Sequence, residues 1–275
     1  MLAFDLHSHS TRSDGLLPPA EVVARAARHG VRALALTDHD EVSGLNEARV
    51  SADAHGIDFI NGVEISVTWG KQTLHVVGLH IDPDHPQLAA GLEHIRVGRH
   101  ERAQGIAAGL EEAGIPGSLA GARAFVTNPE LVGRTHFARF LVQQGYARDV
   151  QAVFRKYLAT GKPGYVPHQW ASLEQATRWI EASGGIAVLA HPGRYGLSGA
   201  ERDALLAQFV EAGGAAIEVV TGSHTPDQYA TWARYAQRYG LLASTGSDFH
   251  GPEEGREFGT LPDLPGGLKP VWERF

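Results

Sequence analysis

Residues 3–9 read AFDLHSH, an apolar run that ends in two histidines one residue apart. The run predicts a buried strand at residues 3–6. Because side chains alternate along an extended chain, His7 and His9 project from the same side. An apolar run followed by a polar residue returns at residues 33–39 (ALALTDH), 186–191 (IAVLAH) and 241–250 (LLASTGSDFH). The opening stretch is therefore the first instance of a pattern, a buried strand followed by a polar side chain, that returns along the chain.

Amphipathic segments separate these runs, and the alternation predicts repeated βα units. The chain has 275 residues, 43% of them hydrophobic, which is enough for a large core. We expect further strands at residues 59–60 with 63–67, 74–79 and 216–219, and helices at residues 18–30, 43–56, 172–182, 201–211 and 226–238. The pattern predicts an α/β fold, a distorted (β/α)7 TIM-like barrel.

The pattern changes after residue 86, where about 75 residues look helical and contain no convincing strand. Alternation of strands and helices resumes after residue 163. We therefore predict a barrel built from residues 1–86 and 164–275, with a helical insertion, or cap, at residues 87–163. The last two dozen residues are rich in glycine and proline and are expected to form surface loop.

Candidate metal ligands lie in or directly after the predicted strands. In a βα barrel the carboxyl ends of the strands converge on one face, so residues far apart in the sequence can meet there. Six imidazoles and three carboxylates can hold two or three divalent ions. The predicted ligands are His7, His9, Asp14, His39, Glu64, His75, His191, Asp248 and His250.

The alternative is a set of hydrogen-bonded core histidines and acidic helix caps, which does not explain why so many follow strands. The remaining histidines fall mostly in helices and loops and receive no metal role, although His168 could contact a substrate. Asp38 and Asp40, on either side of His39, are expected to orient ligands rather than bind metal. Asp5 is expected to be structural.

Composition narrows the classes of protein that remain. The chain has no cysteine, so disulfides, thiolate ligands and a cysteine nucleophile are excluded. The formal net charge is −7 without a basic run, which disfavours long duplex DNA as a partner. The first residues look unlike a signal peptide and no apolar run is long enough to span a membrane, so we expect a cytoplasmic protein. The sequence sets no oligomeric state.

Six motifs stand in order along the chain: DLHSHSTRSDG, LALTDHD, GVEIS, LHVVGLH, VLAHP and STGSDFH. With them the sequence resembles the PHP (polymerase and histidinol phosphatase) metallophosphoesterase family over essentially its whole length. The resemblance implies a distorted seven-stranded barrel with up to three metal ions at its carboxyl face. No ligand position departs from the family pattern.

The resemblance also implies how the ligands are divided among the ions, with Glu64 shared by the first two. The implied sets are His7, His9, Glu64 and Asp248; Glu64, His75 and His191; and Asp14, His39 and His250. Mixed nitrogen and oxygen ligands suit Mn, Fe or Zn better than Mg or Ca, and Mn is the first candidate, with Fe or Zn as alternatives.

The expected reaction is attack of a metal-bridging hydroxide on phosphorus, in line with the leaving group. Asp248 is expected to orient or deprotonate the attacking water. Either His39 or His250 is expected to help the leaving oxygen depart, and both, with Asp14, are expected to lie against the substrate.

The predicted insertion carries candidate substrate contacts. Arg99 and Arg102 share a helical stripe, and the GRTH group contains Arg134, Thr135 and His136 at a predicted helix start, where an anion is favoured. For any single arginine a solvated basic face is the simpler interpretation. Together these residues are predicted to bind a phosphate or ribose.

This cap resembles that of the family branch that removes the 3′-phosphate from nucleoside 3′,5′-bisphosphates. A substrate with two phosphates would place one at the metals and leave the other for the cap arginines. The alternatives are 5′–3′ cleavage of short oligoribonucleotides, hydrolysis of histidinol phosphate, hydrolysis of a C–N bond, and a metal-stabilised binding module without catalysis. The expected partner is a small phosphorylated nucleotide or a short RNA.

Overall fold

The computed structural model describes residues 4–126 and 128–275, so the first residue of the predicted strand at 3–6 lies outside it. Two compact units are distinguished by their internal contacts. The first is formed by the chain up to Leu92 and from Trp170 onward, and the second by Glu93–Gln169. The sequence pattern placed the insertion at residues 87–163.

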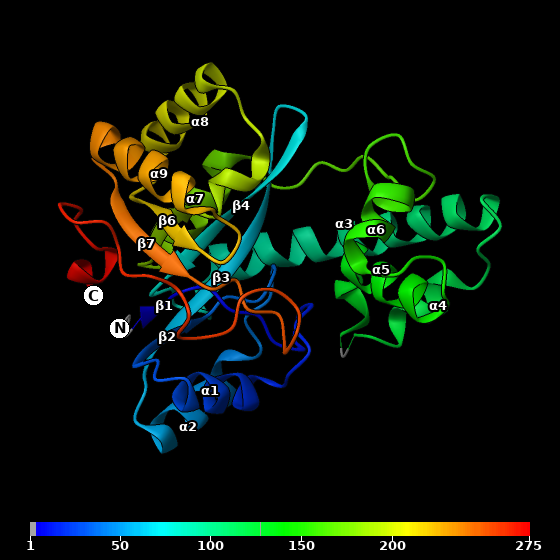
Figure 1. Cartoon of the computed structure of the whole chain (residues 1–275), viewed down its shortest axis with the longest axis horizontal. Coiled ribbons are helices and arrows are strands. Elements are labelled where there is room, and N and C mark those ends of the chain that lie inside the picture. Colours follow the sequence, from blue (N-terminus) through cyan, green and yellow to red (C-terminus); the bar gives the residue numbers. More distant parts are fainter. Residues whose placement is uncertain (1–3, 127) are drawn as a thin grey trace. The chain divides into compact units, whose positions relative to one another are not determined.

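Seven strands in the described part of the first unit form one sheet whose spatial order follows the sequence. The ends of this sheet approach each other, because Leu6 N donates a hydrogen bond to Thr245 O at 3.0 Å and Ser8 bridges Phe249. The predicted distorted seven-stranded barrel is thus confirmed (Figure 1). The strands are β1 (Phe4–Asp5), β2 (Ala33–Leu36), β3 (Asp58–Trp69), β4 (Gln72–Leu79), β5 (Ile186–Leu189), β6 (Ala216–Thr221) and β7 (Leu242–Gly246).

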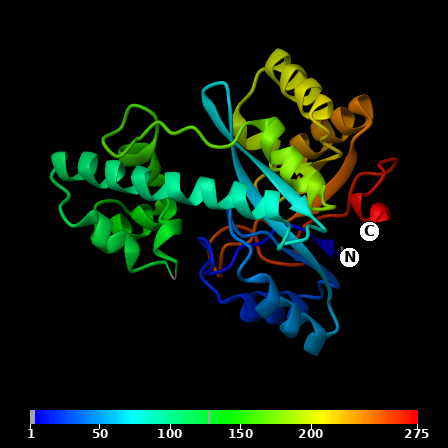
Figure 2. The same ribbon diagram turned by 180° about the vertical axis from the view of Figure 1, so that it is seen from behind.

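Strand β4 is the source of the distortion, because it runs antiparallel to both β3 and β5 while the other neighbours are parallel. It follows β3 through a tight turn at Gly70, whose φ of 58° lies in the left-handed region. Figure 2 shows the two strands as one long hairpin. The apolar pattern predicts this strand but not its direction. The reversal brings the first half of β4 to the rim where the parallel strands end.

Five α-helices of the first unit flank the sheet, with α1 and α2 on one side and α7, α8 and α9 on the other (Figure 1). Local sequence explains where they start and stop. Capping boxes at Ser172, Ser198 and Thr225 begin three of them, and left-handed Gly56 ends α2. The helices are α1 (Pro19–Arg28), α2 (Leu45–His55), α7 (Leu173–Ala182), α8 (Gly199–Glu211) and α9 (Pro226–Tyr239).

A cluster of small and branched apolar side chains fills the barrel. Members such as Ala35, Val77, Val188 and Ala216 come from different strands and are almost completely buried. Near the C-terminus, the 3₁₀ helix η4 (Val271–Arg274) adds the buried Val271 to this cluster. The core lies below the polar side chains that follow the strands, and it fixes their position.

The second unit contains helices and, among its described residues, no strand. It has its own apolar core, in which Ile106, Phe137, Leu141 and Leu158 are buried. Its helices are α3 (Pro86–Glu112, which begins before the unit), α4 (Ser118–Arg123), η1 (Pro129–Leu131), α5 (Arg134–Gln143), α6 (Val150–Val153) and the π-helix η2 (Phe154–Leu158).

The described helices include none that is both long enough and apolar enough to cross a lipid bilayer. The cytoplasmic location expected from the sequence stays a prediction.

Candidate metal centre

The nine predicted ligands gather at one rim of the barrel, although they come from six of its strands and the loops that follow. Three groups of side chains offer ligand atoms that lie within 4.8 Å of one another. Eight of the predicted ligands belong to these groups, and the ninth, His191, lies 2.8 Å from Glu64. The groups are His7, His9, Glu64 and Asp248; His39, Glu64 and His75; and His9, Asp14, His39 and His250.

The first group surrounds one carboxylate oxygen of Glu64. His7 Nε2 and His9 Nε2 each lie 3.3 Å from Glu64 Oε2. The same two nitrogens lie 3.5 Å and 3.2 Å from Asp248 Oδ1. Both imidazoles and Glu64 are completely buried. These four side chains are the set that the family resemblance implies for one ion.

The second group uses the other oxygen of Glu64. His75 Nδ1 lies 2.9 Å and His191 Nε2 lies 2.8 Å from Glu64 Oε1, and the two nitrogens are 3.4 Å apart. His39 also contacts this carboxylate, but through the first oxygen: its Nδ1 lies 2.9 Å from Glu64 Oε2. Glu64 thus offers one oxygen to each of two groups, as a bridging carboxylate does.

The third group centres on Asp14. His250 Nε2 lies 3.3 Å and His39 Nε2 3.9 Å from Asp14 Oδ1. His9 Nδ1, which the sequence did not include here, is 4.0 Å from the same oxygen. The two nitrogens of His9 therefore face two different groups.

Whether these residues suit a metal can be judged from buried polar atoms that have no hydrogen-bond partner. A buried nitrogen or oxygen that lacks a hydrogen bond is costly unless something else binds it. Seven such atoms occur among the predicted ligands, and together they form a donor set of the kind that holds divalent cations. They are His7 Nε2, His9 Nδ1, His9 Nε2, Asp14 Oδ1, His39 Nδ1, Glu64 Oε2 and His191 Nδ1.

The carboxylates of the centre are held in their charged form. Burial opposes ionisation of Glu64, but the neighbouring imidazoles of His39, His75 and His7 outweigh it and keep the pKa well below its usual range. The pKa of Asp14 and that of Asp248 are likewise low despite burial, because histidines surround both groups. Ionised carboxylates are the form that binds a cation.

The pKa values of the histidines are shifted in different directions by their surroundings. Burial lowers the pKa of His75 to about 4, even though Glu64 pulls it upward. Burial also lowers the pKa of His191, with Arg194 adding to the effect. Burial works in the same direction on His9, but Asp248 and Glu64 outweigh it and raise its pKa to about 10. A cation between those carboxylates would take the place of the proton on His9.

The backbone carries strain at the same rim. His191 has φ 28°, Asp248 has φ 57° and Asp40 has φ 52°, a region that non-glycine residues seldom occupy. Asp40 accepts hydrogen bonds from the Ser66 backbone N at 2.7 Å and hydroxyl at 2.9 Å. Such conformations persist only where surrounding contacts fix them, and they concentrate at functional sites.

The profile of the PHP domain family matches residues 5–222 of the chain. The chain belongs to the PHP domain family. It is 54% identical over 276 residues to a 3′,5′-nucleoside bisphosphate phosphatase of Chromobacterium violaceum, covering 100% of this chain and 97% of that relative. It is 46% identical over 272 residues to the 5′–3′ exoribonuclease Rnm of Escherichia coli, covering 98% of this chain and 92% of that relative.

Two solved structures share the fold of this PHP domain chain. One is an amidohydrolase from Chromobacterium violaceum with bound sulfate and no metal, with a TM-score of 0.97 and 53% identity over 99% of this chain and 95% of that one. The other is a predicted metal-dependent phosphoesterase of Bifidobacterium adolescentis, with a TM-score of 0.82 and 26% identity over 97% and 92% of the two chains.

Two aspartates of this PHP domain chain hold the loops that carry candidate ligands. Asp38 accepts hydrogen bonds from Ser10 N at 2.7 Å, Ser10 Oγ at 2.6 Å and Ser13 Oγ at 2.6 Å, and so fixes the loop that carries Asp14. Asp5 accepts from Ser247 N at 2.9 Å, one residue before Asp248. Both aspartates support the loops rather than reach the ligand groups.

Two charged residues of the centre were missed. Glu218, in β6, lies 2.7 Å from His7 Nδ1, and Arg194 Nη1 donates to Asp248 Oδ2 at 2.9 Å. Glu218 could have been found as the single charge in the apolar strand AAIEVV, because burying a carboxylate requires partners. Arg194 stands three residues after His191 in HPGR, where the sequence gives no comparable signal.

The predicted substrate contacts of the insertion lie together in the second unit. Arg99 and Arg102 are each 9% exposed, and Arg134 and Thr135 are half-buried. Burial, with Arg134 and Arg99 nearby, lowers the pKa of Arg102 to about 9. His136 Nδ1 accepts a hydrogen bond from Gly133 N at 3.0 Å, so this side chain also caps α5.

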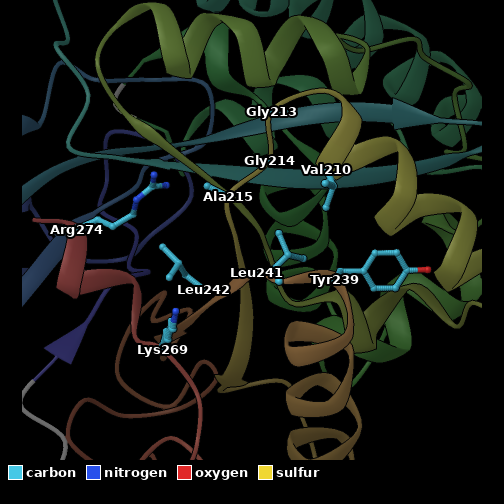
Figure 3. Close-up of a pocket in the computed structure, with 10 residues that line it drawn as sticks. Val210, Gly213, Gly214, Ala215, Tyr239, Leu241, Leu242, Lys269 and Arg274 are labelled. Atoms are coloured by element: carbon cyan, nitrogen blue, oxygen red, sulfur yellow. The ribbon is translucent and has the colours of Figure 1, made fainter.

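A cavity of about 470 Å³ lies where strands β6 and β7 begin (Figure 3). Its lining includes Leu241 and Leu242 at the start of β7, with Lys269 and Arg274 from the C-terminal segment. It contains none of the predicted ligands. The candidate metal ligands instead follow the carboxyl ends of β1, β2, β5 and β7, as expected for this fold, and are joined there by Glu64 of β3 and by His75 from the first half of the antiparallel β4.

Proposed function

We propose that this chain is a metal-dependent phosphatase that removes the 3′-phosphate from nucleoside 3′,5′-bisphosphates. The products are a nucleoside 5′-phosphate and inorganic phosphate. The observation that carries the proposal is the rim on which six imidazoles and three carboxylates converge. The 54% identity to a bisphosphate phosphatase over the full chain supports this choice of substrate.

The residues present fit two or three divalent ions, which would be held by the three sets that the family resemblance implies. Because nitrogen and oxygen ligands are mixed and thiolates are absent, the donor set suits Mn, Fe or Zn better than Mg or Ca. Mn is our first candidate, and Fe and Zn are the alternatives. Ions bound there supply charge for the phosphoryl oxygens and make a water molecule nucleophilic at neutral pH. Glu64, with one oxygen in each of two groups, would hold two of them close together.

We assign orientation of the attacking water to Asp248. Its Oδ1 faces His7 and His9, while its Oδ2 accepts from Arg194, and both contacts keep the carboxylate charged. A carboxylate with a strongly lowered pKa is a good acceptor for directing a water O–H and a poor base.

His39 and His250 are the candidates to protonate the leaving 3′-oxygen. Their side chains are 15% and 19% exposed, whereas His7 and His9 are completely buried. A proton donor has to reach the leaving group, and these two imidazoles, with Asp14, face the accessible side of the centre.

The second phosphate is assigned to the second unit. Arg99, Arg102 and Arg134 are close enough that two of them lower the pKa of the third. Like charges held together in partly buried surroundings favour an anion, and guanidinium groups bind phosphate in a bidentate manner. Thr135 and His136 stand beside them at the start of α5.

A substrate panel tests the reaction. The metal-loaded protein should release phosphate from adenosine 3′,5′-bisphosphate and leave AMP, while histidinol phosphate should give no more than a slow background rate. Phosphate and nucleotide products are quantified separately. Absence of phosphate release from every 3′,5′-bisphosphate tested, with metal bound, would overturn the proposal.

Arginine variants test how the two phosphates are divided. Arg102→Ala and Arg134→Ala should each raise KM for a 3′,5′-bisphosphate about tenfold or more, since charge-assisted hydrogen bonds are worth about 1.5–3 kcal/mol. KM for a simple aryl phosphate should stay unchanged. Arg123→Ala, an exposed arginine of the same unit, is the matched control. Equal effects on both substrates would contradict the assignment.

A second candidate function is 5′–3′ hydrolysis of short RNA. It is favoured by the identity of 46% and 43% to two 5′–3′ exoribonucleases over nearly the whole chain. The same rim could cleave a phosphodiester, with the arginines at a 5′-phosphate. Comparing kcat/KM for a 5′-phosphorylated trinucleotide with that for adenosine 3′,5′-bisphosphate decides which substrate is preferred.

A further inference from the structure

Glu218 is a buried carboxylate that contacts two of the predicted metal ligands, His7 and His191, but belongs to none of the ligand groups. It lies in β6 and is 1% exposed. His7 Nδ1, after β1, lies 2.7 Å from Glu218 Oε1. The backbone N of His191, after β5, donates to Glu218 Oε2 at 2.6 Å. Each oxygen of this side chain thus serves a different predicted ligand.

The local structure of β6 directs Glu218 toward the inside of the barrel. Ala216, two residues earlier and on the same face of the strand, belongs to the interior cluster. The pairing of β6 with β7 shifts register between Glu218 and Val220. An irregularity of this kind re-aims side chains at the ends of barrel strands. The charge of Glu218 is tolerated there because both oxygens have N–H partners.

The contact with His7 determines which of its nitrogens carries hydrogen. A carboxylate only accepts, so Nδ1 of His7 must carry the hydrogen that it shares with Glu218. Nε2 of a neutral imidazole is then left with its lone pair. This nitrogen has no hydrogen-bond partner and lies 3.3 Å from Glu64 Oε2 and 3.5 Å from Asp248 Oδ1.

The contact with His191 holds a strained backbone. His191 has φ 28° and ψ 54°, which a non-glycine residue adopts only under constraint. The hydrogen bond from its N–H to Glu218 is such a constraint, and the ring Nε2 of the same residue reaches Glu64 Oε1 at 2.8 Å. Loss of this bond would allow the backbone to relax and move the ring.

We propose that Glu218 is a positioning residue that holds His7 in its metal-binding tautomer and His191 in its metal-binding backbone conformation. It thereby sets the affinity of the two ion sites that share Glu64. The third group, around Asp14, has no contact with Glu218 and keeps its affinity. This inference rests on the metal centre of the proposed function and not on the identity of the substrate.

Glu218→Gln is the decisive substitution, because it preserves the shape and removes one acceptor. A glutamine side chain has one acceptor oxygen and one donor nitrogen, whereas His7 and His191 both present N–H groups. Either the His191 bond is lost or His7 changes to the tautomer with hydrogen on Nε2. We expect two sites to bind Mn²⁺ about 10–100-fold more weakly, the range usual for residues behind metal ligands. The remaining site should bind as in the wild type.

Affinity is measured on the full-length protein by competition between the protein and a chromogenic chelator for Mn²⁺. Glu257→Gln, a partly exposed glutamate paired with Arg25, is the matched control and should bind as the wild type does. Melting of the metal-free proteins and circular dichroism report whether folding is preserved. Selective weakening of two sites supports the proposal, and unchanged or uniformly weakened binding overturns it.

Two further measurements keep the proposal falsifiable. Nitrogen-15 spectra of the imidazoles in the Zn²⁺ protein should show His7 with hydrogen on Nδ1 in the wild type, and a changed tautomer or His191 signal in Glu218→Gln. If that variant does not fold, Glu218→Asp keeps the charge but cannot reach both donors, and should show the same selective loss. Wild-type protein that binds no divalent ion would instead refute the proposed function.

Discussion

At the scale of single residues, buried acidic side chains are concentrated at and around the candidate metal centre. Asp5, Asp14, Glu64 and Glu218 are buried, and Asp248 is mostly so, and each lies in a strand or in a loop that follows one. Each has an imidazole or backbone N–H as partner, because an unpaired buried carboxylate is too costly to keep. Burial raises the pKa of Asp5 to about 7, although the Ser247 N–H lowers it.

The raised pKa of Asp5 predicts a pH-dependent loss of stability in metal-free protein. Between the usual value of 3.8 and about 7 the folded state keeps a proton that the unfolded state has released. Stability therefore falls as pH rises through this window. Asp5→Asn cannot ionise, so its free energy of unfolding should rise relative to the wild type from pH 4 to pH 7, by no more than about 4 kcal/mol.

Denaturant unfolding of both proteins in the presence of a chelator measures this difference at several pH values. Above pH 7 the difference should be constant, because Asp5 is then ionised in both states. A difference that stays flat from pH 4 to pH 7, or that falls, contradicts the raised pKa.

At the scale of elements, the β3–β4 hairpin is what completes the centre. Glu64 lies in β3 and His75 in β4, and the antiparallel register pairs His75 with Ser66, two residues beyond Glu64. A parallel strand entered through a helix would have placed His75 near the amino end of the sheet. The tight turn at Gly70 makes the reversal possible.

Gly70→Ala should destabilise the hairpin, because its φ of 58° is strained for any residue with a Cβ. We expect a loss of about 1 kcal/mol in the free energy of unfolding, measured with guanidinium chloride. Gly199→Ala is the control, since Gly199 is helical and an added Cβ there meets no atom within 4 Å. Equal losses for both variants would argue against strain at the turn.

At the scale of the whole molecule, the candidate metal centre joins segments from both ends of the chain. His7 lies near the N-terminus and His250 near the C-terminus, and the insertion separates β4 from β5. Bound ions would therefore link strands that are distant in sequence, and binding to the folded state alone adds to its stability.

Removing divalent ions should lower the melting temperature of the protein. One site filled at 100 times its Kd contributes about 2.7 kcal/mol, so two or three sites amount to a shift of several degrees or more. The measurement is thermal unfolding with and without a chelator, followed by back-titration with Mn²⁺ until two or three equivalents restore it. A melting temperature that does not respond to chelation would contradict a metal centre built into the fold.

Much of this molecule could be predicted from its sequence. The alternation of apolar runs and amphipathic segments predicts the barrel, and capping residues such as Ser172 and Gly56 predict where helices begin and end. That the candidate ligands would gather was predictable, because polar side chains after buried strands share a rim in such a barrel. The direction of β4 was not, because periodicity is the same for both directions of a strand.

The sequence by itself determined the ligand types, their order along the chain and the class of chemistry that nitrogen and oxygen donors allow. Only the tertiary structure decided that His9 faces two of the groups, which oxygen of Glu64 faces which neighbours, and that Glu218 and Arg194 contact the candidate ligands from behind. The physical reason is that these relations depend on hydrogen bonds and distances between segments far apart in the chain, whereas composition and periodicity report only on neighbours.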